Sequence, residues 1–237
     1  MRQNNRVGTI VGLWIIAVVI GLTAVSASPE PEKELPSRTI YLIRHGDYDH
    51  DDERDADIGK ALVPLGVVQA RLVAARLRGM PVEWSSLHSS TMTRARQTAR
   101  VISDDLGLEV QTSKILRECT PPTWRADIMA DETEEDLLAC EQQIQEAFKR
   151  YLVPAEKSDQ HDIIVGHGNV IRWFVTQALG VESKAWLGMS IGNCSLTVIS
   201  VRGDGSMKVL AFSDLGHIPP NLQTRTAPGQ PRDLQVP

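Results

Sequence analysis

Short apolar runs alternate with helical patterns along most of the chain. Four β-branched or apolar runs have the length of buried strands, and the segments between them place apolar residues three and four positions apart, as in amphipathic helices. The predicted strands are 39–43, 84–88, 109–112 and 162–165, and the predicted helices are 66–78, 91–106, 132–152 and 169–179. Two further strands, 195–201 and 207–212, flank Gly203-Asp204-Gly205 as a predicted hairpin.

The order of these elements predicts the fold class. Strands that alternate with helices form largely parallel sheets, because each helix returns the chain to the same end of the sheet. We therefore expect a single three-layer α/β/α domain with a mostly parallel sheet over residues 38–213. Residues 214–237 are polar and rich in Pro, which predicts an extended C-terminal tail. A chain of 237 residues holds one such domain more readily than two.

The amino-terminal segment, residues 1–27, differs in kind from the rest. Arg2 and Arg6 precede a stretch without charged residues, 7–25. As a helix, about 19 residues reach about 28 Å, close to the hydrocarbon thickness of a bilayer. A transmembrane anchor is the favoured interpretation, and a signal peptide cleaved after small residues is the alternative. Residues 28–37, rich in Pro and Glu, are predicted to be a linker.

The distribution of charged residues indicates on which side of a membrane the domain lies and which partners it is expected not to bind. Positive residues before an anchor stay on the cytoplasmic side, so the domain is expected to be non-cytoplasmic. An inner-membrane or periplasmic site and a mitochondrial membrane both fit, as does export after cleavage. The net charge of −5 and the scattered basic residues argue against nucleic-acid binding. Three cysteines without metal-ligand spacing predict neither a disulfide framework nor a zinc site.

Two histidine motifs stand at the ends of predicted strands. Arg44-His45-Gly46 follows 39–43, and Gly166-His167-Gly168 follows 162–165. Ligands of open α/β sheets bind at the carboxyl ends of strands, and the following helix termini attract anions. Arg44 and Arg94 offer planar forks for phosphate oxygens, and a protonated His167 adds a donor. These groups predict a phosphate site that needs no metal or other cofactor.

The chemistry of such a site requires a nucleophile and an acid. His45 can attack with a neutral ring nitrogen if its other ring nitrogen donates to a backbone carbonyl. Glu118 is the candidate that protonates the leaving oxygen and later activates water, for which its pKa must be raised. Taken singly, each of these residues is more often an ordinary surface or core side chain. His50, His161 and His217 are interpreted as surface residues.

Taken in order, the motifs resemble those of the histidine phosphatase, or phosphoglycerate mutase-like, superfamily. They are Arg44-His45-Gly46, His88-Ser89-Ser90 with Arg94-Ala95 and Gln97-Thr98-Ala99, and Gly166-His167-Gly168. The resemblance covers roughly residues 38–212. It implies that His45 is phosphorylated, that Glu118 donates the proton and that no cofactor takes part. The implied phosphate ligands are Arg44, Arg94, His167 and Gly168.

Within that superfamily the chain resembles the mitochondrial phosphoglycerate mutase-like serine/threonine phosphatases. The shared segments are 41–45, 90–95, 116–118, 169–172 and 216–220. This resemblance implies phosphoserine and phosphothreonine of proteins as substrates, and a homodimer that uses the tail. The linker lacks the Trp-Asp repeat through which those phosphatases form larger oligomers, so that assembly is not carried over.

Two other functions remain open from the sequence. A small-molecule phosphatase or a phosphoglycerate mutase-like enzyme would use the same motifs. The pair Asp47-Tyr48 and the short stretch 118–132 speak against a mutase, which needs room for a second acidic group of its substrate. A scaffold that binds phosphorylated partners with little turnover belongs to another class, and the complete set of motif residues speaks against it.

Overall fold

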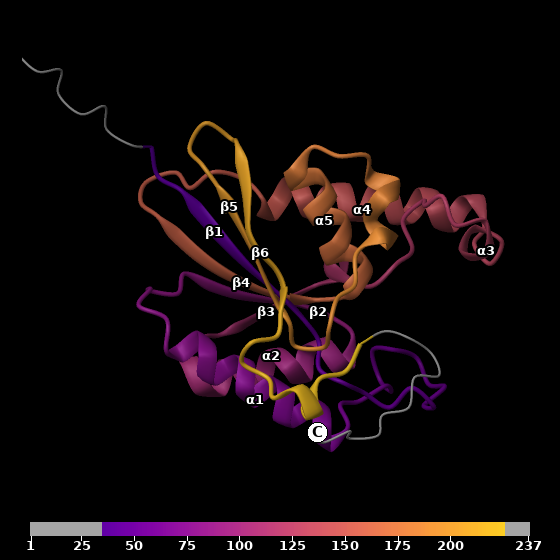
Figure 1. Ribbon diagram of the computed structural model, residues 1–237, viewed down its shortest axis with the longest axis horizontal. Coiled ribbons are helices and arrows are strands. Elements are labelled where there is room, and N and C mark those ends of the chain that lie inside the picture. The colour runs from indigo at the N-terminus through magenta and orange to yellow at the C-terminus, as the bar shows by residue number, and fades with distance from the viewer. Residues whose placement is uncertain (1–34, 226–237) are drawn as a thin grey trace, which may run out of the picture. The chain divides into compact units, whose positions relative to one another are not determined.

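Residues 35–225, the part of the chain that the computed structural model describes, contain a six-stranded sheet with helices on both faces (Figure 1). The strands are β1 (Arg38–Arg44), β2 (Ser86–Ser90), β3 (Val110–Ser113), β4 (Gln160–Gly166), β5 (Leu196–Val201) and β6 (Met207–Asp214). The α-helices are α1 (Pro64–Arg78), α2 (Thr93–Leu106), α3 (Ala126–Met129), α4 (Glu134–Tyr151) and α5 (Gly168–Leu179). Three short 3-10 helices are η1 (Lys114–Leu116), η2 (Ser183–Gly188) and η3 (Pro220–Leu222).

The sheet is mostly parallel, as the order of elements predicts. Its strand order is β3-β2-β4-β1-β5-β6, and the first four strands run parallel to one another. Strand β5 is antiparallel to β1, and β6 is antiparallel to β5, so the predicted hairpin forms one side of the sheet. Because β1 lies beside β4, the chain segments that follow these two strands leave the sheet at the same edge.

Alternate side chains of the strands enter two separate cores. In β1, Ile40 and Leu42 pack with buried residues of α4 and α5, whereas Tyr41 and Ile43 pack with residues of α1 and α2. Successive side chains of a strand point to opposite faces, so a strand covered on both faces is apolar throughout. This arrangement confirms the three-layer α/β/α architecture, with α1 and α2 on one face and α4 and α5 on the other (Figure 1).

Local signals explain where the helices begin and end. Pro64 is the first residue of α1, where its missing N–H costs no hydrogen bond. Thr133 accepts a hydrogen bond from the backbone of Asp136 and so caps the start of α4. Gly107 and Gly180 end α2 and α5 in the left-handed conformation, with φ of 72° and 65°. Side chains other than Gly and Asn are strained there.

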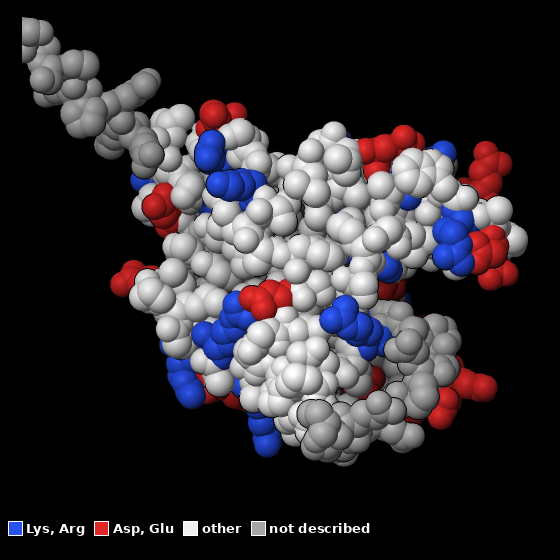
Figure 2. Space-filling model, in the orientation of Figure 1, with Lys and Arg blue, Asp and Glu red and all other residues white. Residues whose placement is uncertain are grey.

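The predicted membrane segment, 1–27, lies outside the described residues. Within residues 35–225, no helix has both the length and the apolar character that a membrane span requires. On the face shown in Figure 2, acidic and basic side chains are interspersed. That face carries no broad basic stripe of the kind that nucleic acids bind.

Residues 215–225, which we call the C-terminal strap, pack against the domain. Leu215 and Ile218 belong to the core beneath α1 and α2, and Arg225 forms an isolated β-bridge with Gly192. His217, interpreted from the sequence as a surface residue, is partly buried and lies 3.0 Å from the carbonyl oxygen of Cys194. The polar composition of the tail conceals these two apolar anchors.

Cys119 and Cys140 form a disulfide, so the expectation drawn from the cysteine count is wrong for this pair. They stand 21 residues apart in the sequence, a separation that carries no recognisable spacing pattern. They meet because α4 packs against η1 and the loop that follows it, which places their Cα atoms 5.6 Å apart. Cys194 is buried and free, and burial raises the pKa of its thiol.

Reduction of this disulfide is expected to destabilise the domain. Cross-linking residues 21 positions apart restricts the unfolded chain and contributes about 3 kcal/mol to stability. The midpoint of urea unfolding should therefore fall when dithiothreitol is added. The double variant Cys119→Ser/Cys140→Ser should start at the lower midpoint and show no response to dithiothreitol. A wild-type midpoint that does not change on reduction would contradict a stabilising disulfide.

Candidate phosphate-transfer site

The predicted site residues meet at the carboxyl edge of the sheet. Arg44 ends β1 and His45 follows it, whereas His167 follows β4, the strand hydrogen-bonded to β1. Arg94 lies in the first turn of α2. All four side chains are buried, and the rings of His45 and His167 are 5.2 Å apart between centroids. The structure thus brings together four residues that are up to 123 positions apart in the sequence, from Arg44 to His167.

The ring of His45 is held in one tautomer. Its Nδ1 lies 2.8 Å from the carbonyl oxygen of Gly46, and its Nε2 lies 3.1 Å from Nε of Arg94. A guanidinium group has only donors, so Nε2 must accept and Nδ1 must carry the proton. Nε2 therefore presents a lone pair beside a cationic group. This is the condition that the sequence analysis set for a nucleophilic His45.

Burial keeps both histidines neutral in the substrate-free site. Desolvation lowers the pKa of His45 well below its usual value, and the nearby Arg44 and His167 add to the effect. Desolvation also lowers the pKa of His167, with further contributions from Arg94 and Arg44. The protonated His167 expected from the sequence concerns the site with phosphate bound. A bound dianion would favour the protonated form, because an opposite charge raises the pKa of a histidine.

The unfolding free energy is expected to fall as the pH is lowered from 7.5 to 5.5. In the unfolded chain, His45 and His167 take up protons near pH 6.5. In the folded protein the pKa of each is lower, so protonation requires a lower pH. The unfolded state then binds more protons, which lowers stability by about 1 kcal/mol for each histidine at pH 5.5. Glu118 acts in the opposite direction, because its raised pKa lets the folded state take up a proton first, but it is a single group.

Urea unfolding at several pH values measures this dependence. The double variant His45→Gln/His167→Gln should show a weaker loss of stability over the same interval. Equal pH dependence in the variant and the wild type would show that these histidines are not the groups responsible.

Glu118 lies at the same edge, on the side of α5. Its Oε1 accepts a hydrogen bond of 3.1 Å from the backbone N–H of Asn169, in the first turn of α5. Desolvation raises the pKa of the carboxyl group, although Arg44 and Arg94 act to lower it. A carboxyl group with a raised pKa can carry the proton that a leaving oxygen needs.

Asn169 and Arg172 hold the Glu118 loop, a role that was not predicted from the sequence. Asn169 donates from Nδ2 to the carbonyl oxygen of Cys119 at 3.0 Å. Arg172 in turn donates to Oδ1 of Asn169 at 2.7 Å, and its guanidinium lies 4.7 Å from the ring of Trp186. The spacing of Asn169 and Arg172 on one helix face is a signal that could have identified the pair.

Arg44 lies against the start of α5. It donates from Nη1 to the carbonyl oxygen of Ile191 at 2.8 Å, whereas its buried Nε has no hydrogen-bond partner among the described residues. Buried donors of a guanidinium group are normally paired, so this one fits the place of an anion. A Cβ at Gly168 would lie 3.2 Å from Ile191 and 3.5 Å from Nε of Arg44, so a glycine suits this close approach.

Tyr48 forms a wall of the site that the sequence analysis did not identify. Its ring meets that of His45 edge-on at 5.2 Å, and the guanidinium of Arg94 lies 4.7 Å from its centroid. The ring of His50 stacks on that of Tyr48, with 3.9 Å between the ring centroids. Arg94 is thereby held between His45 and an aromatic face. Within residues 35–225, no cluster of three or more His, Cys, Asp or Glu side chains could hold a metal ion.

Comparisons with known proteins agree with this geometry. The chain is 38% identical over 204 residues to the mitochondrial serine/threonine-protein phosphatase Pgam5 of Caenorhabditis elegans, covering 81% of this chain and 68% of that protein. Its counterpart from Xenopus tropicalis is 33% identical over 205 residues, covering 82% and 70%. The solved structure of Bacillus stearothermophilus YhfR has a TM-score of 0.61 at 20% identity, covering 77% of this chain and 100% of that one, and shows the shared fold.

The family model that matches describes the histidine phosphatase superfamily, branch 1. It spans residues 40–214, from β1 to the end of β6, and so includes every site residue described above. The chain is therefore a phosphatase that belongs to the histidine phosphatase superfamily.

Proposed function

We propose that this protein hydrolyses phosphoserine and phosphothreonine esters of proteins through a phosphorylated His45, without a metal cofactor. The observation that carries the proposal is the orientation of the His45 ring. Its Nδ1–H points to Gly46, and its Nε2 lone pair lies beside Arg94 at 3.1 Å. A neutral imidazole with an unprotonated nitrogen next to fixed positive charge is suited to attack on a bound phosphate, once Arg94 donates to the phosphate instead.

The first step forms the phosphoenzyme. Arg44, Arg94 and His167 bind the phosphoryl oxygens, joined by the backbone N–H of Gly168 at the start of α5. Nε2 of His45 forms a bond to phosphorus, and the ester bond to the serine or threonine oxygen breaks. Glu118 transfers its proton to that leaving oxygen.

The second step regenerates the enzyme. The carboxylate of Glu118 now takes a proton from a water molecule, whose oxygen bonds to phosphorus while the P–N bond to His45 breaks. Inorganic phosphate leaves, and both His45 and Glu118 return to their starting protonation states. Glu118 thus serves first as an acid and then as a base.

The choice of protein substrates rests on the relatives. Both are named serine/threonine-protein phosphatases, and the chain covers about 70% of their length or slightly less.

We also propose that the catalytic domain lies outside the cytosol, held by residues 1–27 or released by their cleavage. The relatives are named mitochondrial, and disulfides such as Cys119–Cys140 form and persist in oxidising compartments. Mass spectrometry of the mature amino terminus distinguishes anchor from cleaved signal, and sedimentation tests the proposed homodimer.

Phosphate release from two substrates tests the function. The full chain in detergent, with EDTA present, is given a phosphothreonine peptide or 3-phosphoglycerate. Hydrolysis of the peptide is the expected result. Turnover of 3-phosphoglycerate alone would point instead to a small-molecule enzyme. Tight peptide binding without release of phosphate would point to a scaffold.

A further inference from the structure

Two buried amide side chains hold the backbone on either side of the nucleophile. Asn193 donates from Nδ2 to the carbonyl oxygen of His45 at 3.0 Å. Gln69 accepts at Oε1 from the backbone N–H of Asp47 at 2.9 Å. Asn193 and Gln69 are 3% and 0% exposed, so water does not replace these bonds. The peptide units that carry His45 and Gly46 are thus held from both ends.

The free ends of these amides meet at Thr224 in the C-terminal strap. Nε2 of Gln69 lies 2.9 Å from the hydroxyl oxygen of Thr224, and that hydroxyl lies 2.9 Å from Oδ1 of Asn193. An amide nitrogen only donates, so the hydroxyl accepts from Gln69 and gives its single proton to Asn193. The hydroxyl therefore completes a chain of hydrogen bonds from the backbone of Asp47 to that of His45.

The strap is anchored well enough to hold this hydroxyl in place. The carbonyl oxygen of Leu222 accepts a hydrogen bond of 2.8 Å from Nε2 of Gln69. The carbonyl oxygen of Thr224 accepts one of 3.0 Å from the backbone N–H of Asn193. A Cβ at Gly192 would lie 2.6 Å from the Leu215 side chain, so the strap packs directly on the turn before β5.

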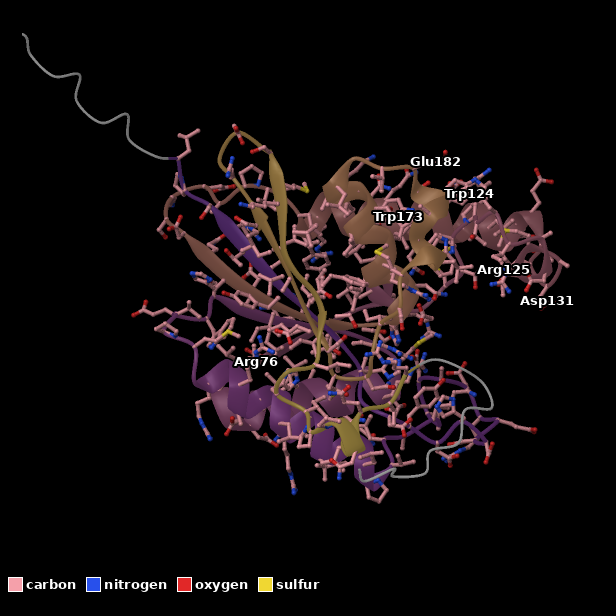
Figure 3. All side chains as sticks on the ribbon, viewed as in Figure 1. Arg76, Trp124, Arg125, Asp131, Trp173 and Glu182 are labelled. Carbon is pink, nitrogen blue, oxygen red and sulfur yellow. A yellow bond between two sulfur atoms is a disulfide. The ribbon has the colours of Figure 1, made fainter. Side chains whose placement is uncertain are left out.

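A second anchor ties the strap to α1. Arg76, labelled in Figure 3 on that helix, donates to Asp214 at 2.6 Å and to Nδ1 of His217 at 3.1 Å. His217 accepts at Nδ1, so its Nε2 carries the proton and donates to the carbonyl oxygen of Cys194 at 3.0 Å. The next residue along the strap, Ile218, is buried in the core.

We propose that Thr224 is a positioning residue for the catalytic histidine, acting through Asn193 and Gln69. The inference rests on the proposed role of His45 as nucleophile. Loss of the hydroxyl leaves Oδ1 of Asn193 without this donor and leaves Gln69 Nε2 with only the Leu222 carbonyl oxygen as acceptor, which weakens the hold on both side chains. The backbone around His45 then loses its fixed position, and small displacements of a reacting group cost large factors in rate.

The test compares three variants of the full chain. Thr224→Val keeps the shape of the side chain but removes the hydroxyl, whereas Thr224→Ser keeps the hydroxyl. Asn221→Ala, on an exposed residue of the same strap, is the matched control. The expected result for Thr224→Val is a loss in kcat of about tenfold with KM changed by less than about twofold. Thr224→Ser should recover most of the rate, and Asn221→Ala should match the wild type.

Amide hydrogen exchange supplies a readout that does not need activity. In Thr224→Val the N–H of Asp47 should exchange about tenfold faster than in the wild type, while the amides of β1 and β4 keep their rates. If the wild type shows no turnover, the proposed function fails, but the exchange rate of Asp47 still decides whether Thr224 fixes this backbone.

Three results would overturn the inference. One is a Thr224→Val variant with wild-type kcat and unchanged exchange at Asp47. Another is a rise in KM alone, because displacement of the nucleophile acts on kcat. The third is faster exchange throughout β1 and β4 in both Thr224→Val and Thr224→Ala, which would show general destabilisation of the domain instead of a local effect on the backbone at His45.

Discussion

Replacing His45 by alanine is expected to lower kcat/KM for a phosphothreonine peptide by at least on the order of 10⁴-fold. The variant lacks the ring nitrogen that is proposed to bond to phosphorus and that accepts a hydrogen bond from Nε of Arg94. The proposed phosphate ligands Arg44 and Arg94 remain in this variant, so peptide affinity should change far less than the rate. Steady-state phosphate release and peptide binding by calorimetry measure the two effects.

The control for this variant is His161→Ala. His161 lies near the start of β4, at the opposite end of that strand from His167. Its replacement by alanine is therefore expected to leave the rate unchanged. His45→Gln serves as a second variant of more similar volume, in case the alanine side chain leaves a destabilising cavity. Retention of more than about a tenth of the wild-type rate in both His45 variants would contradict its role as nucleophile.

Replacing Glu118 by glutamine is expected to lower kcat for the same peptide by about 10²- to 10⁴-fold. The amide preserves the shape of the side chain and can still accept from the Asn169 N–H, but it carries no transferable proton. With p-nitrophenyl phosphate, whose leaving group needs no proton, formation of the phosphoenzyme should be nearly as fast as in the wild type. Its hydrolysis should remain slow, because the general base is missing.

Pre-steady-state release of p-nitrophenol separates these steps. Glu118→Gln should give a fast burst equal to the enzyme concentration, followed by slow turnover. Glu135→Gln, an exposed glutamate in the first turn of α4, is the matched control and should behave as the wild type. Equal slowing of the burst and of the later turnover would speak against Glu118 as the proton donor.

The sheet and its helices follow from local patterns in the sequence. The apolar run 39–43 predicts β1 to within one residue at each end, because a strand buried on both faces has no polar positions. The hairpin around 203–205 and the helix ends at Gly107 and Gly180 are equally local signals. The location of both histidine motifs at the carboxyl ends of strands follows from a general rule of α/β folds. The pairing of β1 with β4, which brings the two motifs together, was not predicted.

Features that depend on contacts between distant segments were not predictable in this way. The Cys119–Cys140 disulfide needs the docking of α4 beside η1. The strap looks like a polar tail because few of its residues are apolar, although Leu215 and Ile218 are buried in the core and Leu222 packs against it.

The same limit applies within the site. A nucleophilic His45 requires a backbone carbonyl that accepts from its ring, but the sequence does not show that this carbonyl belongs to Gly46. Nothing in the sequence pairs Gln69 with Thr224, since amide and hydroxyl groups find their partners only when the fold is complete. The effect of burial on the pKa of His167 likewise requires the packed structure.

The most direct test of the mechanism is to trap the phosphoenzyme. Wild type and Glu118→Gln are mixed with p-nitrophenyl phosphate in the presence of EDTA, quenched with alkali within milliseconds and digested for mass spectrometry. The expected result is a single phosphoryl group on His45, at a higher level in Glu118→Gln than in the wild type. Steady turnover without any phosphorylated His45, or with phosphate on another residue, would contradict a phosphohistidine mechanism at this site.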